Sequence, residues 1–414
     1  MDVSRYIRQG VVIPCPESVE IDPDIPPENI AAGVCIHAGS RIRGSGTFIG
    51  PGCIIGAEAP ATVDDCQLGH GVGLKGGYYG SATFLDRCEM GSGSHVRAGT
   101  LLEEQSGAAH SVGFKQTILF PFVTAGSLIN LCDCLMAGGT GRKNHSEIGS
   151  SYIHFNFTPR QDKATASLLG DVPRGVMLDR RPIFLGGQGG LVGPSRIAFG
   201  TVIPAGTVCR DDILEENTLY APPETPGGSP PAREFNPSLY FGIRRIVANN
   251  LLYIGNLHAL RAWYRWVRAR CMAADPYARA CHAGALARIE SGIRERILQL
   301  GGLARKLPRS LELAGSVDGF PGECLRQQRS FLRQWPRLED ALRQDPPEDA
   351  AADSRDVFLK AWEGIDRSIP YPDAVGRVDG ESREAGTRWL QAIVDHTASL
   401  WRPTPAAGGG LAGP

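Results

Sequence analysis

Three histidines in this chain stand where an imidazole could serve as a general base. They are His110 in AAHSVGF, His145 in GRKNHSEIG and His154 in YIHFNF, each in or near a segment that interrupts the repeat described below. Imidazole gains and loses a proton near neutral pH, which suits the deprotonation of an attacking nucleophile. We expect His145 to be the catalytic residue, with Arg142 and Lys143 beside it to hold an anion. The alternative is that each loop histidine has no chemical role.

Two basic residues, Arg97 and Lys115, could bind a phosphate together. They are 18 residues apart, but separate coils of a repeat structure can bring such positions side by side. A guanidinium group can hold a phosphate in bidentate fashion, and an ammonium group adds a point charge. The other interpretation is that both are ordinary charges on an outer surface.

The eleven cysteines indicate neither a disulfide framework nor a metal site. Their number is odd, and Cys53 and Cys88 occupy small inward positions of the repeat, where a thiol acts as a small hydrophobe. Cys132 and Cys134 stand one residue apart, but no second Cys or His pair at zinc spacing follows them. We therefore predict no metal.

These residues lie in a region with a period of six. The apolar residues at every sixth position are Leu185, Leu191, Ile197 and Ile203, then Phe84, Met90, Val96 and Leu102, and also Val123, Ile129 and Leu135. Small residues such as Cys88 and Gly189 take the fifth place of the units. A helix repeats at 3.6 residues and a strand at 2, so neither alone gives this period. A parallel β-helix does, because every sixth side chain points into a narrow prism packed to interior density.

The repeat lapses at four places, 56–67, 103–122, 137–147 and 155–182. Long interruptions of a solenoid become loops that leave the prism, and loops on a rigid scaffold often carry the site. The alternative is that they only pad or cap the coil, which we prefer for 56–67.

The composition changes after Thr207, where glycine thins out and Ala, Leu and Arg recur at helical spacing. Helices are expected from Ile243 onward and at 277–300, 322–344, 354–367 and 381–401, with breaks at Pro308, Pro336, Pro346–Pro347 and Pro370–Pro372. The fold class is therefore α+β. The expected parts are an extended lead-in at 1–29, a β-helix at 30–220, a Pro/Gly linker at 221–237, an all-α domain at 238–401 and a disordered tail at 402–414.

Charge and hydropathy exclude several classes of partner. The 43 basic and 44 acidic side chains give a net charge of −1, so we expect neither nucleic acid nor a membrane surface as a partner. No signal-peptide run stands in residues 1–30, and no stretch approaches the roughly 20 apolar residues of a membrane helix. A cytoplasmic location is expected.

The run from Arg97 to Thr207 resembles the left-handed β-helix acetyltransferase domain of the bacterial bifunctional N-acetylglucosamine-1-phosphate uridyltransferase/glucosamine-1-phosphate acetyltransferase family. The clearest piece, LGGQGGLVGPSRIAFGTVIPAGTV at 185–208, looks like that family's final coils. The resemblance implies a left-handed coil and a homotrimer with sites between subunits. It also implies acetyl-CoA or another acyl-CoA as donor, and a sugar-phosphate or nucleotide-sugar ligand.

The resemblance also implies roles for four residues. Arg97 in RAGTLL and Lys115 in SVGFKQ fall on the family's sugar-phosphate arginine and lysine. Asn156 in HFNF resembles the asparagine of its Asn-Tyr-Asp-Gly loop. Lys163 in DKATASLLGD resembles a second basic residue that precedes an apolar-Gly corner. All four are expected to bind substrate.

The chain departs from the family at the catalytic position. In TAGSLINLCD, Ser127 stands where the family has its general-base histidine, and Asn130 stands where it has a tyrosine. A serine without an adjacent base cannot take the proton of an amine. Ser127 is also the small fifth residue of the Val123 unit, which would explain it structurally. The insertion GGTGRKNHSE beside this position is the reason for choosing His145.

Two functions remain open at this point. The first is a trimeric acyltransferase that acts on a sugar phosphate or nucleotide sugar. The second is a non-catalytic sugar-nucleotide-binding or assembly module that has lost the catalytic histidine. The uridyltransferase half is absent from this sequence, since no Gly-rich nucleotide loop precedes the coils. A carbonic anhydrase of the same fold would need three metal histidines, and no matching spacing is visible.

Overall fold

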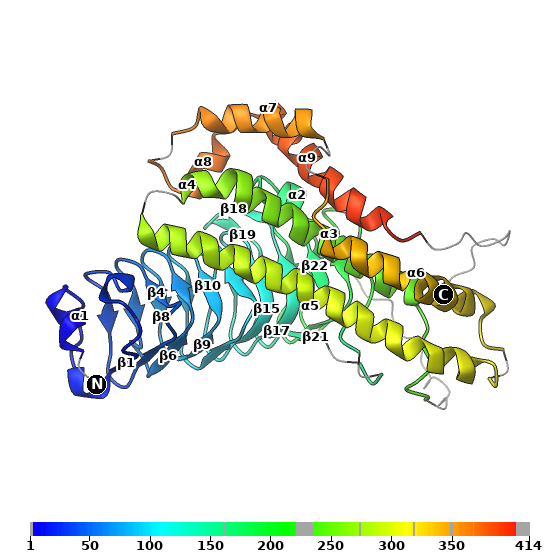
Figure 1. Cartoon of the computed structure of the whole chain (residues 1–414), viewed down its shortest axis with the longest axis horizontal. Helices are drawn as coiled ribbons and strands as arrows, with labels where there is room; N and C mark the ends of the chain where they lie inside the picture. Colours follow the sequence, from blue (N-terminus) through cyan, green and yellow to red (C-terminus); the bar gives the residue numbers. More distant parts are fainter. Residues whose placement is uncertain are drawn as a thin grey trace.

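The structure is a computed structural model, and it describes residues 3–156, 158–160, 162–220, 235–272, 275–317, 319–347, 351–366 and 368–402. A long coil of short parallel strands forms the N-terminal half, and helices lie along one side of it (Figure 1). The predicted α+β class, a left-handed β-helix followed by a helical region, is confirmed. Most of the predicted linker and of the disordered tail lies outside the described residues, in 221–234 and 403–414.

Each coil of the solenoid contributes to three faces, which we call faces 1, 2 and 3. Face 1 is a parallel sheet of β2 (Cys35–Ile36), β5 (Ile54–Ile55), β8 (Gly73–Leu74), β11 (Glu89–Met90), β14 (Gly107–Ala108), β16 (Thr124–Ala125), β20 (Glu147–Ile148), β23 (Phe184–Leu185) and β26 (Val202–Ile203). Face 2 holds β1 (Glu20–Ile21), β3 (Arg41–Arg43), β6 (Ala61–Asp64), β9 (Gly77–Gly80), β12 (Ser94–Val96), β21 (Ile153–Phe155), β24 (Gly190–Val192) and β27 (Val208–Cys209). Face 3 holds β4 (Phe48–Ile49), β7 (Gln67–Leu68), β10 (Ala82–Phe84), β13 (Thr100–Leu102), β22 (Ser167–Leu169) and β25 (Arg196–Ile197).

Two longer strands join faces 2 and 3. β15 (Gly113–Leu119) and β17 (Asn130–Met136) begin on face 2 and continue around the corner onto face 3. Between β17 and β20 the chain leaves the coil as an antiparallel hairpin of β18 (Gly139–Gly141) and β19 (Asn144–His145). The lapse of the repeat at 137–147 therefore marks a segment outside the prism, whereas 103–122 stays within the coil as β14 and β15.

The six-residue repeat fills the interior of the prism as predicted. Phe84, Met90, Val96 and Leu102 are fully buried, and so are the four residues of the later series. Cys53 and Cys88 occupy small inward slots, and each thiol hydrogen-bonds to a backbone carbonyl. Burial raises the pKa of Cys53 to about 12, so this thiol stays protonated and packs as a small apolar group.

The repeat at Val123 was assigned two residues out of phase. Ala125 and Leu131 continue the inward rows, because they pair in register with Ala108 and Phe114 of the preceding coil. Ser127 is therefore not a small inward residue. It lies half-exposed at the corner between faces 1 and 2. The error arose because Val123 and Ile129, each two residues before an inward residue, are also buried. Leu135 was likewise placed in the inward row, but Met136 takes that place and Leu135 faces the helices.

The first 29 residues are more structured than the predicted extended lead-in. They contain α1 (Ser4–Arg8), η1 (Pro16–Ser18) and η2 (Pro27–Asn29), and the coil already begins with β1, which pairs with β3. Tyr6 is 1% exposed, and its hydroxyl donates a hydrogen bond to the carbonyl of Ile25. Buried apolar side chains on this segment cover the open end of the prism, which explains why it does not remain extended.

The C-terminal half is helical, as predicted, but its helices begin and end at other residues than expected. After the short α2 (Val172–Gly175) within the solenoid come α3 (Ile243–Trp263), η3 (Tyr264–Arg268), α4 (Ala269–Cys271), α5 (Pro276–Ala314), α6 (Gly322–Arg343), α7 (Ala352–Glu363), α8 (Tyr371–Gly376) and α9 (Gly380–Ser399). Pro308 and Pro336 were expected to end helices but lie inside α5 and α6. A proline removes one helix hydrogen bond at a cost of about 3 kcal/mol, and packing of the buried neighbours Leu307 and Trp335 opposes that cost. In the described helices no segment is long and apolar enough to cross a membrane.

The helices dock on face 3 because that face carries apolar side chains on its outer side. Leu101, Ile118, Leu135 and Leu168 follow one another in register on successive coils, and all are buried. α5 runs along the coils and contacts β4, β7, β10 and β13 (Figure 1). Gly284 of α5 permits this approach, since a Cβ atom there would collide with the Gln67 side chain.

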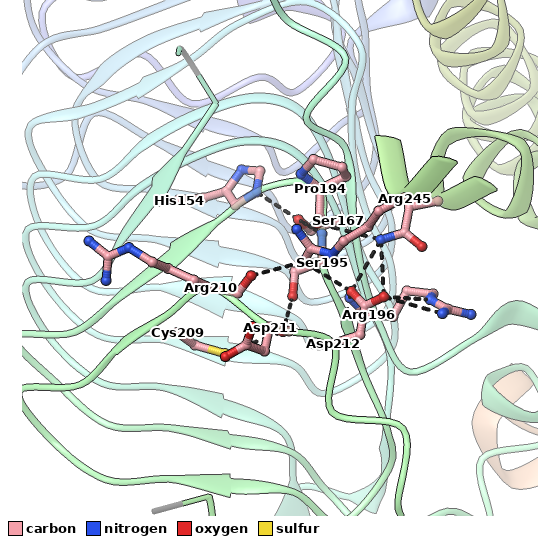
Figure 2. A network of polar contacts seen from close by, with 11 residues as sticks. His154, Ser167, Pro194, Ser195, Arg196, Cys209, Arg210, Asp211, Asp212 and Arg245 are labelled. Atoms are coloured by element: carbon pink, nitrogen blue, oxygen red, sulfur yellow. Dashed lines mark hydrogen bonds and ion pairs between the residues drawn. The ribbon is translucent and has the colours of Figure 1, made fainter. Parts of the chain in front are cut away.

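Polar contacts fix α3 to the final coils. Arg245 of α3 forms an ion pair with Asp212, which also pairs with Arg196 of β25 (Figure 2). Asn249, one helical turn further along α3, donates a hydrogen bond to the same carboxylate. Two cations and an amide thus hold one carboxylate at the junction of the solenoid and the helices.

A buried cluster of charged groups joins the other end of α3 to the corner between faces 3 and 1. Arg268 pairs with Glu104 at 2.6 Å, and the Tyr264 hydroxyl donates to Glu103 at 2.6 Å. Both carboxyl groups are buried, and the buried Arg268 guanidinium is the cation that pairs with Glu104. Burial raises the pKa of Glu103 to about 7, and nearby Glu104 adds to the shift while Arg268 opposes it.

The packing of the prism interior predicts that two leucines contribute very differently to the free energy of unfolding. Leu191→Ala should lower the free energy of unfolding by about 2–5 kcal/mol, because it removes a buried side chain and leaves a cavity in the prism. Leu214→Ala is the matched control, since Leu214 is 61% exposed. Urea unfolding of both variants measures the difference. Equal midpoints would contradict the assignment of Leu191 to the interior.

The Glu103–Glu104 pair predicts a pH dependence of stability. A glutamic acid in an unfolded chain has a pKa of about 4.3, so between that value and the folded pKa of Glu103, about 7, the folded protein retains a proton that the unfolded chain has lost. Stability therefore falls as the pH rises through this window. Glu103→Gln cannot ionise and should show a smaller fall in thermal-unfolding profiles. Parallel profiles for wild type and variant would refute this, and Glu147→Gln, an exposed position, serves as control.

Candidate functional site

Arg97 and Lys115 are brought side by side on face 2. Val96 pairs in register with Phe114, and the backbone N–H of Arg97 donates to the carbonyl of Phe114 at 2.8 Å. Because Val96 and Phe114 point into the prism, the next residue on each strand points outward. Arg97 is exposed and Lys115 is half-buried. Both side chains therefore lie on the same face on adjacent coils, and their binding of a phosphate stays a prediction.

Cys132 is the next outward residue in this row. It pairs in register with Lys115, and the Arg97 Nη2 lies 3.7 Å from its Sγ. Burial raises the pKa of the Cys132 thiol and Asp133 adds to the shift, while Arg97 and Lys115 oppose it. The thiol is therefore neutral and supplies no counter-charge to Arg97 or Lys115.

Asn156 and Lys163 gather around a different cation, Arg296 of α5. The Arg296 Nη2 lies 2.6 Å from the Asp133 Oδ1, and the Asn156 amide donates to the Asp133 Oδ2 at 3.2 Å. Arg296 also donates to the backbone carbonyl of Lys163, whose side chain is exposed. Asn156 thus has a structural partner. Asp133 directly follows Cys132 in β17, so this group lies next to Cys132.

Ser127 has a base beside it, contrary to the prediction. His110 precedes it by one coil, and the Ser127 Oγ lies 2.9 Å from the His110 Nδ1. Pairing of Gly107 with Thr124 sets this register at the corner between faces 1 and 2. A serine hydroxyl next to an imidazole is the arrangement that moves protons in many active sites. The signal in the sequence was the 17-residue spacing, which is the length of this coil.

The two remaining histidines lie elsewhere. His145 belongs to the β18–β19 hairpin, and its Nδ1 lies 3.0 Å from the carbonyl of Arg142. Arg142 itself donates to the carbonyls of Gln105 and Phe122, so the hairpin sits at the corner between faces 3 and 1. Within one chain, His145 is thus on the far side of face 1 from the Ser127 corner. Sequence reasoning placed it near the altered position because the insertion follows Ser127 closely in the chain.

His154 is an interior residue of the prism. It pairs in register with Leu191, is 3% exposed, and hydrogen-bonds to the Cys132 carbonyl. Its Nε2 also hydrogen-bonds to the Ser167 hydroxyl (Figure 2). Burial lowers the pKa of His154 to about 4. A neutral, enclosed imidazole has no path to a substrate, so this histidine is structural.

Six residues on the outer side of face 2 form a strip, which we call the face-2 strip: His110, Ser127, Asn130, Cys132, Lys115 and Arg97, of which Cys132 is buried. Asn130 lies between the His110–Ser127 pair and Cys132. The Asn130 Oδ1 is 3.8 Å from the Cys132 Sγ, and Asn130 follows Ser127 by three residues. The strip combines a proton-transfer pair with an anion-binding pair. Among the described residues no group of three or more His, Cys, Asp and Glu side chains could hold a metal ion.

Comparisons with known proteins match about half of the chain. No protein-family model matches the chain. "Bifunctional protein GlmU" of Nitratidesulfovibrio vulgaris is 26% identical over 222 residues, which is 53% of this chain and 43% of that protein. The protein of the same name from Thermotoga petrophila is 25% identical over 212 residues, 51% of this chain and 42% of the relative. The matched segment thus spans under half the length of these curated relatives.

A solved structure also aligns with part of the chain. It is perosamine N-acetyltransferase from Caulobacter crescentus, in complex with CoA and GDP-perosamine. The alignment covers 32% of this chain and 53% of that one, at 16% sequence identity and a TM-score of 0.10. This score is too low for a comparison of the two sites.

The buried pair beside the strip predicts a large stability effect. Asp133→Ala should cost about 3–5 kcal/mol, because it leaves the Arg296 guanidinium buried with only the longer, 3.8 Å contact to Glu295. Replacing both partners, as Asp133→Leu with Arg296→Met, should restore much of the loss. Urea unfolding measures both variants. As a control, Arg309→Ala breaks the exposed pair with Glu312 and should change stability by less than about 1 kcal/mol. A wild-type midpoint for Asp133→Ala would show that the pair is dispensable.

Proposed function

Because the chain is a hexapeptide-repeat, acetyltransferase-like protein, we propose that it transfers an acyl group from an acyl-coenzyme A to an amine of a sugar phosphate or nucleotide sugar. The observation that carries this proposal is the hydrogen bond between Ser127 and His110, on the same strip as Arg97 and Lys115. The family resemblance of the sequence suggests the reaction class. The face-2 strip supplies groups suited to it.

The Ser127–His110 pair would act as the base. As the amine attacks the thioester carbonyl, its proton passes to the Ser127 Oγ while the serine proton passes to the His110 Nδ1. The carbonyl carbon then forms the amide bond as its bond to sulfur breaks. The coenzyme leaves as a thiolate and takes up a proton. A serine alone could not hold the transferred proton, but a serine in contact with an imidazole can relay it.

Arg97 and Lys115 would hold the phosphate of the acceptor. The exposed guanidinium can bind two phosphate oxygens, and the half-buried ammonium adds charge from the neighbouring coil. Asn156 and Lys163, at the edge near Arg296, would contact more distant parts of the ligand. An acyl-CoA as the donor follows from the reaction class.

His145 stays a second candidate for the base through an assembled oligomer. The helices cover face 3, so a homotrimer would be built from faces 1 and 2, and the hairpin of one subunit could then approach the strip of its neighbour. The homotrimer and the cytoplasmic location remain predictions.

A second function, sugar-nucleotide binding without turnover, is favoured by one observation. The position that holds the general-base histidine in the resembling family carries Ser127, which cannot by itself gain a charge. In that case Arg97 and Lys115 would bind the ligand, and the helical region would contact a partner.

Thiol release measures the proposed activity directly. Acetyl-CoA with a panel of amino-sugar phosphates and nucleotide amino sugars should release free thiol. His110→Gln and Ser127→Ala should each lower the rate by about 10²–10⁴-fold with little change in acceptor affinity, because neither residue holds the phosphate.

Arg97→Ala and Lys115→Ala should instead raise the KM for the acceptor, by about tenfold or more. Arg41→Ala is the matched control, because Arg41 is an exposed arginine on face 2 outside the strip. Loss of turnover in His145→Gln but not in His110→Gln would move the base to the hairpin. Ligand binding that needs Arg97, with no thiol release from any acceptor, would favour the binding module.

A further inference from the structure

A cavity with a basic lining lies where the last third of α5 meets the loop after β21 and the segment before α3. We call it the basic cavity. Its volume is about 460 Å³, within the range of small-molecule sites. Four of its lining residues are cations, namely Arg160 of the loop and Arg305, Lys306 and Arg309 of α5, and none of the described lining residues is acidic. The charge is thus local, since the whole chain has a net charge of −1.

The three cations of α5 stand within little more than one helical turn. Arg305 and Arg309 are four residues apart, so they lie on the same side of the helix, and Lys306 is adjacent to Arg305. Like charges at this spacing destabilise a helix, because they repel each other across one turn. An anion bound between them would replace this repulsion with attraction.

Arg160 is held against the cavity from the opposite side. Its Nε donates to the carbonyl of Leu239 at 2.6 Å, and its own carbonyl accepts from the Tyr240 hydroxyl and from the Lys306 Nζ. The guanidinium also lies 5.8 Å from the centre of the Tyr240 ring. Among the described residues its two Nη atoms have no hydrogen-bond partner. Their N–H groups are therefore oriented and unused.

The carboxylates near the cavity do not neutralise it. Arg305 is exposed and, within the described part of the chain, has neither an ion pair nor a hydrogen bond. Arg309 pairs with Glu312 at 3.0 Å, but both side chains are about two-thirds exposed, so water competes with this contact. Asp162 is 7% exposed, and its Oδ2 accepts from the Thr158 hydroxyl. The cations at the cavity thus outnumber the nearby carboxylates.

The number and placement of the cations favour a ligand with more than one phosphate group. A guanidinium group binds two oxygens of one phosphate in a fork, whereas an ammonium group binds as a point charge. The basic cavity has guanidinium groups on two opposite elements, the loop and α5. One phosphate group offers too few oxygens to engage all of them, but two linked phosphate groups can contact both elements at once.

We propose that the basic cavity binds a small anion with two or more phosphate groups, such as pyrophosphate or a nucleoside diphosphate. Arg305 and Arg309 would hold one phosphate group from α5, and Arg160 would hold another from the loop. Lys306 would add its charge from α5, beside the Arg160 carbonyl. The basic cavity shares no residue with the face-2 strip, so the proposal does not depend on the transferase activity.

Calorimetry with pyrophosphate as the probe tests the proposal. The full chain should carry Arg97→Ala and Lys115→Ala, so that the phosphate-binding pair of the face-2 strip does not contribute. In this background pyrophosphate should bind at least about tenfold more tightly than inorganic phosphate. A further change, Arg305→Glu, should weaken pyrophosphate binding by about tenfold or more, because it replaces an attractive charge with a repulsive one. Arg388→Glu makes the same change at an exposed position of α9 and should leave binding unchanged.

A second variant covers the case in which Arg305→Glu fails to fold. Arg309→Ala removes only an exposed ion pair and should barely affect stability, yet it should also weaken pyrophosphate binding. Unchanged pyrophosphate binding in the folded variants of Arg305 and Arg309 would overturn the proposal. Equal affinities for pyrophosphate and inorganic phosphate, or no binding of pyrophosphate in the background chain, would overturn it as well.

Discussion

The packing of the prism interior is the constraint on which the other features depend. Large inward side chains such as Phe84 and Leu102 meet in register on adjacent coils, and a slip of one residue would turn them outward. Fixed register means that outward residues also meet their counterparts, one strand spacing of about 4.8 Å away. Residues distant in sequence thereby become neighbours on the surface, as the Arg97–Lys115 pair illustrates.

The same constraint explains which parts of the site could be predicted. A spacing of 18 residues equals three complete units, so Arg97 and Lys115 could be placed together from the sequence. The Ser127–His110 contact could not, because that coil has 17 residues and the phase of the repeat moves at this point. Counting from Val123 put Ser127 inside the prism, where its hydroxyl would have had no chemical use. Coil length, rather than composition, decided whether this serine faces the interior of the prism or contacts His110 at the corner.

The helical region shows another limit of prediction from the sequence. Its helices could be located by periodicity, but their docking surface could not, because Leu101 and Ile118 lie outside the inward rows and the six-residue spacing had placed Leu135 inside the prism. They form an apolar row only after the coil is wound. The buried partner of Glu104 is Arg268, 164 residues away, and no local pattern connects the two. An arginine is ordinarily expected at the surface, whereas this one is almost fully buried.

Docking of the helices also determines what the solenoid can do with its other faces. With face 3 covered, a ligand or a second copy of the chain has access to faces 1 and 2, and the face-2 strip lies on one of these. The β18–β19 hairpin projects from the opposite edge of face 1. In a closed symmetric assembly, an edge of one subunit meets a different edge of the next. The hairpin and the strip, which one chain keeps apart, are therefore the two elements that such an assembly would bring together.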